Sequence, residues 1–219
     1  MTSHDVVARL RRILHTTKIG HSGTLDPNAT GVLLVLIGKA CKALPFLEDT
    51  DKEYIATLQL GIQTISDDIW MEPLKKAPIQ PITDFQSVLN SFRGVQKQVP
   101  PMISSVRVNG RKLYEYAREG IAVTRPEREV TIYDIEALDS QKLQFRVSCS
   151  SGTYVRSLCH DIAQKTGNLG CMSSLCLLYT SPHPLTQHPK TLVFQKRLPA
   201  AAPDSTPLSF EPSVSKSLR

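Results

Sequence analysis

The longest nearly unbroken apolar run of this chain, Val32 to Ile37, is only six residues long. A short apolar run bounded by polar residues predicts a buried strand, whereas a membrane-spanning helix needs about 20 apolar residues. We therefore expect a folded domain with no membrane contact. The first ten residues include His4, Asp5 and Arg9. These do not fit a basic and apolar secretion leader, so we expect a cytoplasmic protein.

Helical and strand patterns alternate around this run. A helix is expected from Thr2 or Ser3 to about Leu14, because its apolar residues recur on one stripe. Two strand patterns over 129–138 and 142–149 indicate an antiparallel hairpin. The other expected elements are a short helix over 39–47, a strand over 53–60, a helix over 84–92, an extended stretch over 95–108, and helices over 112–119 and 153–165. Together these patterns predict an α+β protein in which helices pack against a sheet.

Composition changes sharply near Gly170. All 11 glycines lie at or before this position, whereas seven of the 15 prolines follow it. A proline-rich segment without periodic apolar residues cannot offset its ordering entropy by burial. We therefore expect a folded domain over 1–170 and a divergent, disordered tail over 171–219 that carries no function. No strand pattern precedes the first helix, so a strand before that helix is expected to be missing.

The charge balance and the cysteines bound the possible partners. The formal net charge is +6, from 26 Lys and Arg against 20 Asp and Glu. This excess fits a polyanionic partner such as nucleic acid, although many proteins of similar charge bind none. The five cysteines contain no CxxC pair followed by a second CxxC or an HxxxH motif. Neither a zinc or other metal site nor a disulfide framework is expected.

The loop over 18–31 carries the most informative carboxylate of the chain. Asp26 lies just before the buried strand, with glycines on both sides of it and Pro27 directly after it. Such a loop can turn tightly and then becomes rigid. A fixed carboxylate beside an apolar wall is a candidate nucleophile or general base. The alternative is an aspartate that only caps a turn, as Asp-Pro pairs often do.

Five segments of the chain form a set. They are GHSGTLDPNATGVL (20–33), KEYIA (52–56), LGIQTISDD (60–68), QVPPMISSVRVNGRKLYEYAR (98–118) and CSSGTYVRSL (149–158). In order and spacing this set resembles the pseudouridine synthases, most closely the bacterial TruB-type tRNA pseudouridine-55 synthases. The resemblance implies the pseudouridine synthase fold, a mixed and largely antiparallel sheet flanked by helices, with 1–170 as the catalytic domain. It also implies tRNA as partner through its T-loop or elbow, no cofactor, and a monomer without an obligate protein partner.

The resemblance also implies roles for three residues. In this family an aspartate matching Asp26 cleaves the N-glycosidic bond of one uridine, at position 55, after that nucleotide has been flipped out of the RNA. The freed uracil is then rotated and rejoined through carbon. Tyr54 matches the tyrosine that stacks on the flipped uracil, and Arg156 matches the arginine that pairs with the aspartate. Whether Asp26 attacks the ribose or removes a proton from it stays open. A core tyrosine and a solvated arginine are the ordinary alternatives for Tyr54 and Arg156.

Further residues match family positions around the RNA. His21 matches the histidine that presses into the RNA loop where the target base has left. Asp68 matches a carboxylate that bonds the tyrosine corresponding to Tyr154. The segment over 98–128 resembles the mobile thumb that closes over the T-loop. The predicted RNA-binding residues are His21, Asp68, Tyr154, Lys18, Gly23, Thr24 and Leu25.

Two titratable residues near these motifs are expected to have structural roles. Asp67 reads as a solvated turn residue, and His160 as a structural side chain within its helix. Asp67 and Asp68 are not expected to form a glycosidase pair, because neighbours on an extended strand point to opposite faces.

The chain also departs from the family pattern. Met1 stands where a strand ending in Lys-Pro-x-Gly should have ended, and the family's C-terminal RNA-binding module is not visible after Gly170. Trp70 and Met71 follow Asp68, where the family usually has a glycine nearby. Two main interpretations therefore stay open: an active tRNA pseudouridine synthase, or an inactive RNA-binding remnant of that family. A third is the same chemistry on a small RNA or a messenger RNA.

Overall fold

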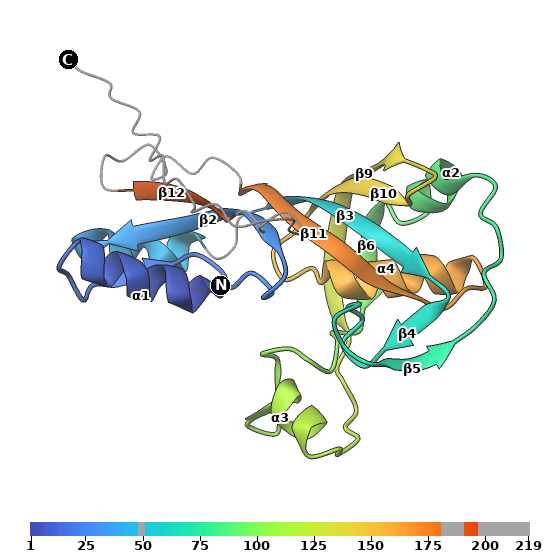
Figure 1. Cartoon of the computed structure of the whole chain (residues 1–219), viewed down its shortest axis with the longest axis horizontal. Helices are drawn as coiled ribbons and strands as arrows, with labels where there is room; N and C mark the ends of the chain where they lie inside the picture. Colours follow the sequence, from blue (N-terminus) through green and yellow to red (C-terminus); the bar gives the residue numbers. More distant parts are fainter. Residues whose placement is uncertain (48–50, 181–190, 197–219) are drawn as a thin grey trace, which may run out of the picture.

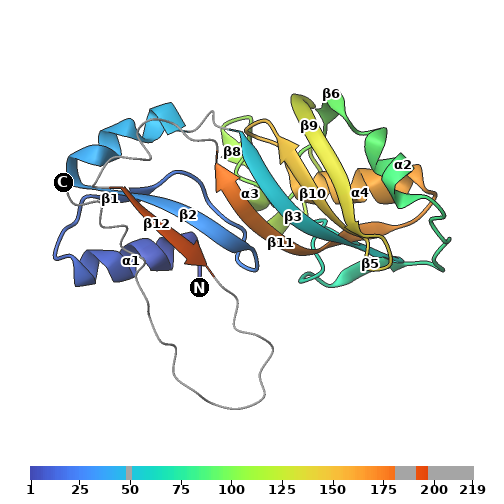
Figure 2. The same ribbon diagram turned by 90° about the horizontal axis from the view of Figure 1, so that it is seen from above.

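In the computed structural model of this chain, residues 1–47, 51–180 and 191–196 are described. An eight-stranded sheet runs along the length of the molecule (Figures 1 and 2). Its strands are β1 (Ile19–His21), β2 (Thr30–Ile37), β3 (Lys52–Leu60), β6 (Gly94–Gln98), β9 (Arg128–Asp139), β10 (Gln144–Cys149), β11 (Gly170–Thr180) and β12 (Thr191–Lys196). Their order is β1-β2-β11-β3-β10-β9-β6, and β12 pairs with β2. The described pairs of this sheet are antiparallel except β2 with β11. The predicted α+β class and the mixed, largely antiparallel sheet are thus confirmed.

The larger apolar core lies between this sheet and α4 (Val155–Lys165), with α2 (Phe85–Asn90) packed beside β9 (Figure 1). Alternate residues of β10 point into it, so that Phe145 and Val147 are completely buried. Ile162 of α4 is also completely buried in this core. The core therefore fixes α4 against the sheet.

A smaller core lies at the other end of the sheet, around β2. Leu33 and Val35 pack toward α1 (Ser3–Ile13). Leu34 and Leu36 pack toward the 3-10 helix η1 (Gly38–Leu47) on the opposite face. Figure 2 shows α1 and η1 on opposite sides of β1 and β2. The apolar run from Val32 to Ile37 is therefore a strand buried on both faces.

Two excursions leave the main sheet. One is the hairpin of β4 (Ile62–Thr64) and β5 (Pro73–Lys76). The other, which we call the α3 lobe (104–124), contains β7 (Arg107–Val108), β8 (Arg111–Lys112) and α3 (Leu113–Arg118). Figure 1 shows this lobe projecting from the body of the molecule. It lies within the segment that resembles a mobile thumb.

The predicted boundary at residue 170 is wrong. Residues 171–180 belong to β11, which lies in the interior of the sheet between β2 and β3. The error has a simple cause, since glycines end at Gly170 but the prolines that mark the compositional change begin only at Pro182. Residues 191–196 form β12 rather than part of a disordered tail. The remainder of the predicted tail, 181–190 and 197–219, lies outside the described residues.

Most predicted elements are confirmed with small shifts at their ends. Thr2 caps α1 by accepting the backbone N–H of Asp5 at 3.2 Å. Asp84 caps α2 by accepting that of Ser87 at 2.9 Å. β1 lies within the residues expected to form a loop, because three residues are too few to show a period. Within the described ranges, no helix has the length and apolar character needed to cross a membrane.

Candidate active site

The loop that carries Asp26 is fastened to the smaller core on both sides. Leu25 is buried beneath α1, and its backbone N–H donates to the hydroxyl of Ser3 at 3.0 Å. The carbonyl of Asp26 accepts the N–H of Ala29 at 3.0 Å, and Ala29 is also buried. The Asp26 side chain is left 32% exposed at the end of this turn. The Asp26 carboxylate is therefore partly open to solvent, while its backbone is held in place.

Arg156 holds this carboxylate with its planar fork. Its Nε lies 3.0 Å from Oδ2 of Asp26, and its Nη2 donates to Oδ1 at 3.3 Å. Its Nη1 donates to the carbonyls of Ser66 at 2.9 Å and Ile103 at 3.1 Å. The Arg156 side chain is only 8% exposed. The structure thus brings together two of the three predicted catalytic residues, 130 positions apart in sequence, in a bidentate pair whose orientation is fixed.

Tyr54 lies on β3 where the two apolar cores meet. It is half-buried and packs against side chains of both cores. Burial raises the pKa of the Tyr54 phenol well above its usual value, and the nearby Cys149 and Asp26 add to this rise. The phenol is therefore neutral at physiological pH, and its ring lies near the Asp26 carboxylate. Both the predicted stacking role and the alternative of a core tyrosine fit this half-buried position.

Asp68 lies behind the Asp26–Arg156 pair, in the turn that follows β4. Its backbone N–H donates to the hydroxyls of Thr64 at 3.1 Å and Ser66 at 3.3 Å, and its Oδ1 accepts the N–H of Trp70 at 3.3 Å. Burial raises the pKa of the Asp68 carboxyl; the Trp70 bond opposes this rise, and Asp26 reinforces it. The turn thus brings a second carboxylate within electrostatic reach of Asp26.

The expected hydrogen bond between Asp68 and Tyr154 is not found among the bonds of the described residues. The Tyr154 backbone instead bonds the side chain of Gln98, and the Tyr154 ring lies 5.6 Å from the guanidinium carbon of Arg128. Tyr154 is the N-cap residue of α4, one residue before its first turn.

The remaining predicted RNA-binding residues lie along the loop before β2. Gly23 and Thr24 are exposed next to Asp26, and a Cβ built on Gly23 would meet nothing within 4 Å. His21 is half-buried, and its Nδ1 has no hydrogen-bond partner among the described groups. Lys18 is exposed at the far end of β1. The side chain of Leu25 belongs to the smaller core, so the structure does not support a contact between RNA and that side chain.

The expectation that Asp67 is a solvated turn residue is wrong. Its side chain is only 14% exposed and lies 3.6 Å from Nδ1 of His160. Its backbone has a φ of 55°, which reverses the chain so that the carboxylate points inward. Burial raises the pKa of Asp67, and His160, Arg125 and Arg156 oppose this rise. Sequence reasoning missed this pair because a left-handed aspartate leaves no periodic signal.

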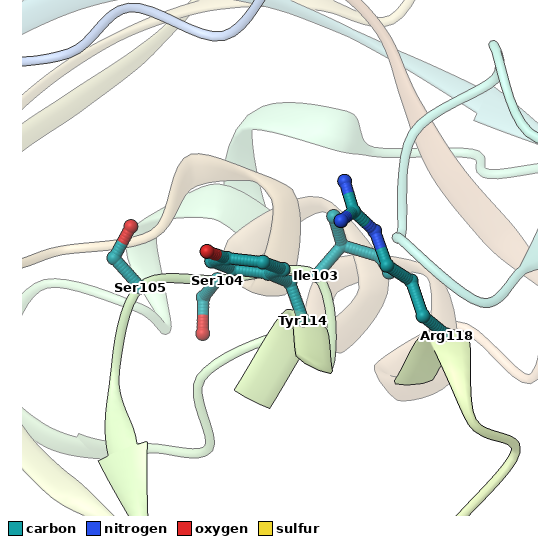
Figure 3. A pocket seen from close by; sticks show the side chains of 5 residues that line it. All are labelled: Ile103, Ser104, Ser105, Tyr114 and Arg118. Carbon is teal, nitrogen blue, oxygen red and sulfur yellow. The ribbon is translucent and has the colours of Figure 1, made fainter. Parts of the chain in front are cut away.

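A hollow of about 290 Å³ lies at the α3 lobe, lined by Ile103, Ser104, Ser105, Tyr114 and Arg118. Figure 3 shows its lining side chains, with the ring of Tyr114 beside the extended side chain of Arg118. The Tyr114 ring lies 5.2 Å from the guanidinium carbon of Arg118 and 5.5 Å from Nζ of Lys112. Ile103, whose carbonyl bonds Arg156, also lines it. An aromatic ring between two cations is typical of surfaces that stack and neutralise nucleic acid.

Comparison with known proteins places this geometry in a family. A profile described as TruB family pseudouridylate synthase (N terminal domain) matches residues 11–155. A protein of Alkaliphilus oremlandii named tRNA pseudouridine synthase B is 48% identical over 178 residues, 80% of this chain and 60% of that protein. One of the same name from Streptococcus pneumoniae is 46% identical, over 80% of this chain and 63% of the relative. The chain thus spans about 60% of the length of these relatives.

Solved structures show the same fold. A crystal structure of a Cbf5-Nop10-Gar1 complex contains a chain with a TM-score of 0.63 and 33% identity, covering 83% of this chain and 46% of that one. An H/ACA RNP bound to a substrate RNA containing 2'-deoxyuridine contains a chain with a TM-score of 0.60 and 29% identity, covering 83% of this chain and 44% of that one. The fold, the motif set and the profile agree, and the chain belongs to the TruB family of pseudouridylate synthases.

Proposed function

We propose that this chain isomerises a uridine of tRNA, at position 55 in the T-loop, to pseudouridine, with Asp26 as the catalytic carboxylate. The observation that carries the proposal is the bidentate pair of Asp26 with Arg156, beside the half-buried ring of Tyr54. An always-charged guanidinium pairs with the carboxylate through two of its nitrogens and aims it. The relatives named tRNA pseudouridine synthase B support tRNA as the substrate.

The proposed reaction rearranges bonds without gaining or losing atoms. The bond between N1 of uracil and C1′ of ribose breaks, and a bond between C5 and C1′ forms. N1 takes up a proton, and C5 gives one up. Asp26 either attacks C1′ or removes a proton from the ribose; both roles need an ionised carboxylate in a fixed position.

The target uridine must leave the RNA stack before Asp26 can reach it. In this proposal the neutral ring of Tyr54 supports the flipped uracil, and His21 enters the space that the base leaves. Tyr154 and the exposed backbone at Gly23 and Thr24 line the RNA around it, while the buried Asp68 supports the site from behind. Cations of the α3 lobe, including Lys112 and Arg118 beside Tyr114, would contact phosphates, and these contacts would weaken with salt.

The test is to incubate the full chain with an unmodified tRNA transcript and map pseudouridine by carbodiimide modification and primer extension. Asp26→Asn is the control, because it keeps the shape of the side chain and removes its charge. We expect a stop at position 55 with the native chain and none with Asp26→Asn. No stop with the native chain would overturn the proposed activity.

The same experiment separates the second interpretation, an inactive RNA-binding remnant. Retained tRNA binding without pseudouridine would support this interpretation.

A further inference from the structure

The first turn of α4 has no cap of its own. Its N-cap residue is Tyr154, and no side-chain hydrogen bond from this residue caps the helix. The first backbone N–H groups of a helix have no partner within the helix and need one elsewhere. Arg156, which holds Asp26, is the second residue of this turn. The orientation of the Asp26–Arg156 pair therefore depends on whatever fixes the turn from outside.

Gln98, at the end of β6, supplies this support. Its Oε1 accepts the backbone N–H of Tyr154 at 2.8 Å, and its Nε2 donates to the carbonyl of Tyr154 at 3.0 Å. Gln98 is only 2% exposed. A carboxamide has one acceptor and one donor side by side, which matches the N–H and C=O of a single residue. Both bonds are therefore satisfied in a buried place where an unsatisfied group would be costly.

Gln98 also begins a segment that lies against the first turn of α4. We call this segment, residues 98–103, the strap. Ser157 donates from its hydroxyl to the carbonyl of Val99 at 2.8 Å, and Nη1 of Arg156 donates to the carbonyl of Ile103 at 3.1 Å. Arg125, which directly follows the α3 lobe in sequence, donates to the carbonyl of Pro100 at 2.9 Å. The strap thus joins the base of the lobe to the turn that carries Arg156.

We propose that Gln98 is a positioning residue for the isomerisation: it fixes Tyr154 and the first turn of α4, and through them aims Arg156 at Asp26. This inference rests on the proposed function. Glutamate at this position could accept from Tyr154 but not donate to it, and would place a charge against a carbonyl. Methionine would fill nearly the same volume and make neither bond. Gln98→Met therefore removes both bonds with little change in packing.

A matched control lies two residues away on the same strand. Gln96 donates from Nε2 to the carbonyl of Phe92 at 2.9 Å and is half-buried. It bonds no residue of α4 among those described. Gln96→Met removes a glutamine side-chain hydrogen bond on the same strand as Gln98→Met does. It leaves the bonds to Tyr154 and within the strap intact.

The first measurement is the single-turnover rate on an unmodified T-stem and loop RNA, with enzyme in saturating excess. Under these conditions the rate constant reports the folded, RNA-bound enzyme, and an unfolded fraction lowers only the amplitude. We expect Gln98→Met and Gln98→Glu to lower the rate constant about 10- to 100-fold, the range for a displaced catalytic group. The rate constant of Gln96→Met should change less than twofold. A rate constant equal to that of the native chain would overturn the inference.

The second measurement does not need activity, so the inference stays testable if the proposed function fails. The Nε–H of Arg156 is assigned in the nitrogen–proton spectrum by its absence in Arg156→Lys. In the native chain and in Gln96→Met we expect this proton to exchange slowly with water, because it is bonded to Asp26. In Gln98→Met it should exchange at least tenfold faster while the backbone spectrum of the core is retained. Equal exchange in both variants would overturn the positioning role.

Discussion

Asp26 and Arg156 meet at one site, but two differently built halves of the molecule hold them. Arg156 belongs to α4, which is packed into the larger core beside completely buried residues such as Phe145 and Ile162. Asp26 belongs to a loop over the smaller core, whose buried anchors are Leu25, Ala29 and the hydroxyl of Ser3. The half that carries the arginine is therefore fixed by many contacts. The half that carries the aspartate has the smaller core, and the loop that bears Asp26 relies on a few anchors.

The largest effect is expected where the two halves join. Arg156→Met removes the fork from Asp26 and takes a donor from the buried carbonyls of Ser66 and Ile103. We expect a loss of about 2–3 kcal/mol in the free energy of unfolding, below the full value for a buried pair because Asp26 is one-third exposed. Urea denaturation measures this loss. Arg156→Lys, which keeps the charge but not the fork, should lose less. Equal stability of Arg156→Met and the native chain would show that the halves do not depend on this pair.

Tyr54 tests the junction from the side of the substrate. Tyr54→Ala removes the ring that touches both cores and is expected to weaken RNA affinity by about 1–3 kcal/mol, the range for one stacked base. Tyr54→Phe keeps the ring and should bind RNA nearly as the native chain does. Fluorescence titration with a labelled T-stem and loop RNA measures both. If Tyr54→Phe loses as much affinity as Tyr54→Ala, the hydroxyl rather than the stacking face makes the contact.

Much of this division could be read in the sequence. The apolar stripe predicted α1, and Val32 to Ile37 predicted the buried strand at the centre of the smaller half. A helix over 153–165 was also expected, and it corresponds to α4. The motif resemblance predicted that Asp26 and Arg156 meet, which no local pattern could show. β11 was missed because its boundary was judged from glycine and proline counts, and these follow turns rather than strand pairing.

The supports behind the pair could not be read in the sequence. The carbonyls of Ser66 and Ile103 bond Arg156, but every residue has a carbonyl, so their role carries no side-chain signal. Gln98 appeared within a motif, yet its two bonds depend on the tertiary approach of β6 to α4. The inward turn of Asp67 depends on a left-handed backbone that a sequence period does not reveal.

Ser3 tests the half of the molecule that carries Asp26. Ser3→Ala removes the hydroxyl that accepts the buried N–H of Leu25, one residue before Asp26. We expect a loss of about 1–2 kcal/mol in the free energy of unfolding and a fall of about tenfold in the single-turnover rate, because the loop loses its anchor. Thr2→Ala is the matched control, since it removes the cap of the same helix at a cost of about 1 kcal/mol. It should leave the rate within twofold. A similar fall in rate for both variants would mean that α1 as a whole, rather than the Ser3 bond, holds Asp26.

The smallest effect is expected for a buried charge in the half that carries Arg156. Burial raises the pKa of Asp161, on α4, from 3.8 to about 6; nearby His160 opposes this rise and Asp67 adds to it. The native state therefore holds this proton more tightly than the unfolded chain does. The stability linked to it is fully present below pH 3.8 and is lost as the pH rises through about 6. Asp161→Asn should match the native chain at the acid end. Above about pH 6, Asp161→Asn should be more stable than the native chain by about 1 kcal/mol, once solvent screening is allowed for.

Denaturation of both proteins across this pH range measures the difference, and Glu127→Gln supplies the control. Glu127 is a carboxylate whose side chain is 56% exposed, and its loss should change stability by less than about 0.5 kcal/mol at every pH. Because α4 is held by the larger core, a gain of this size in Asp161→Asn should leave the single-turnover rate unchanged. A rate that rises or falls with the stability of α4 would show that Arg156 is as loosely held as Asp26, and the contrast between the two halves would then fail.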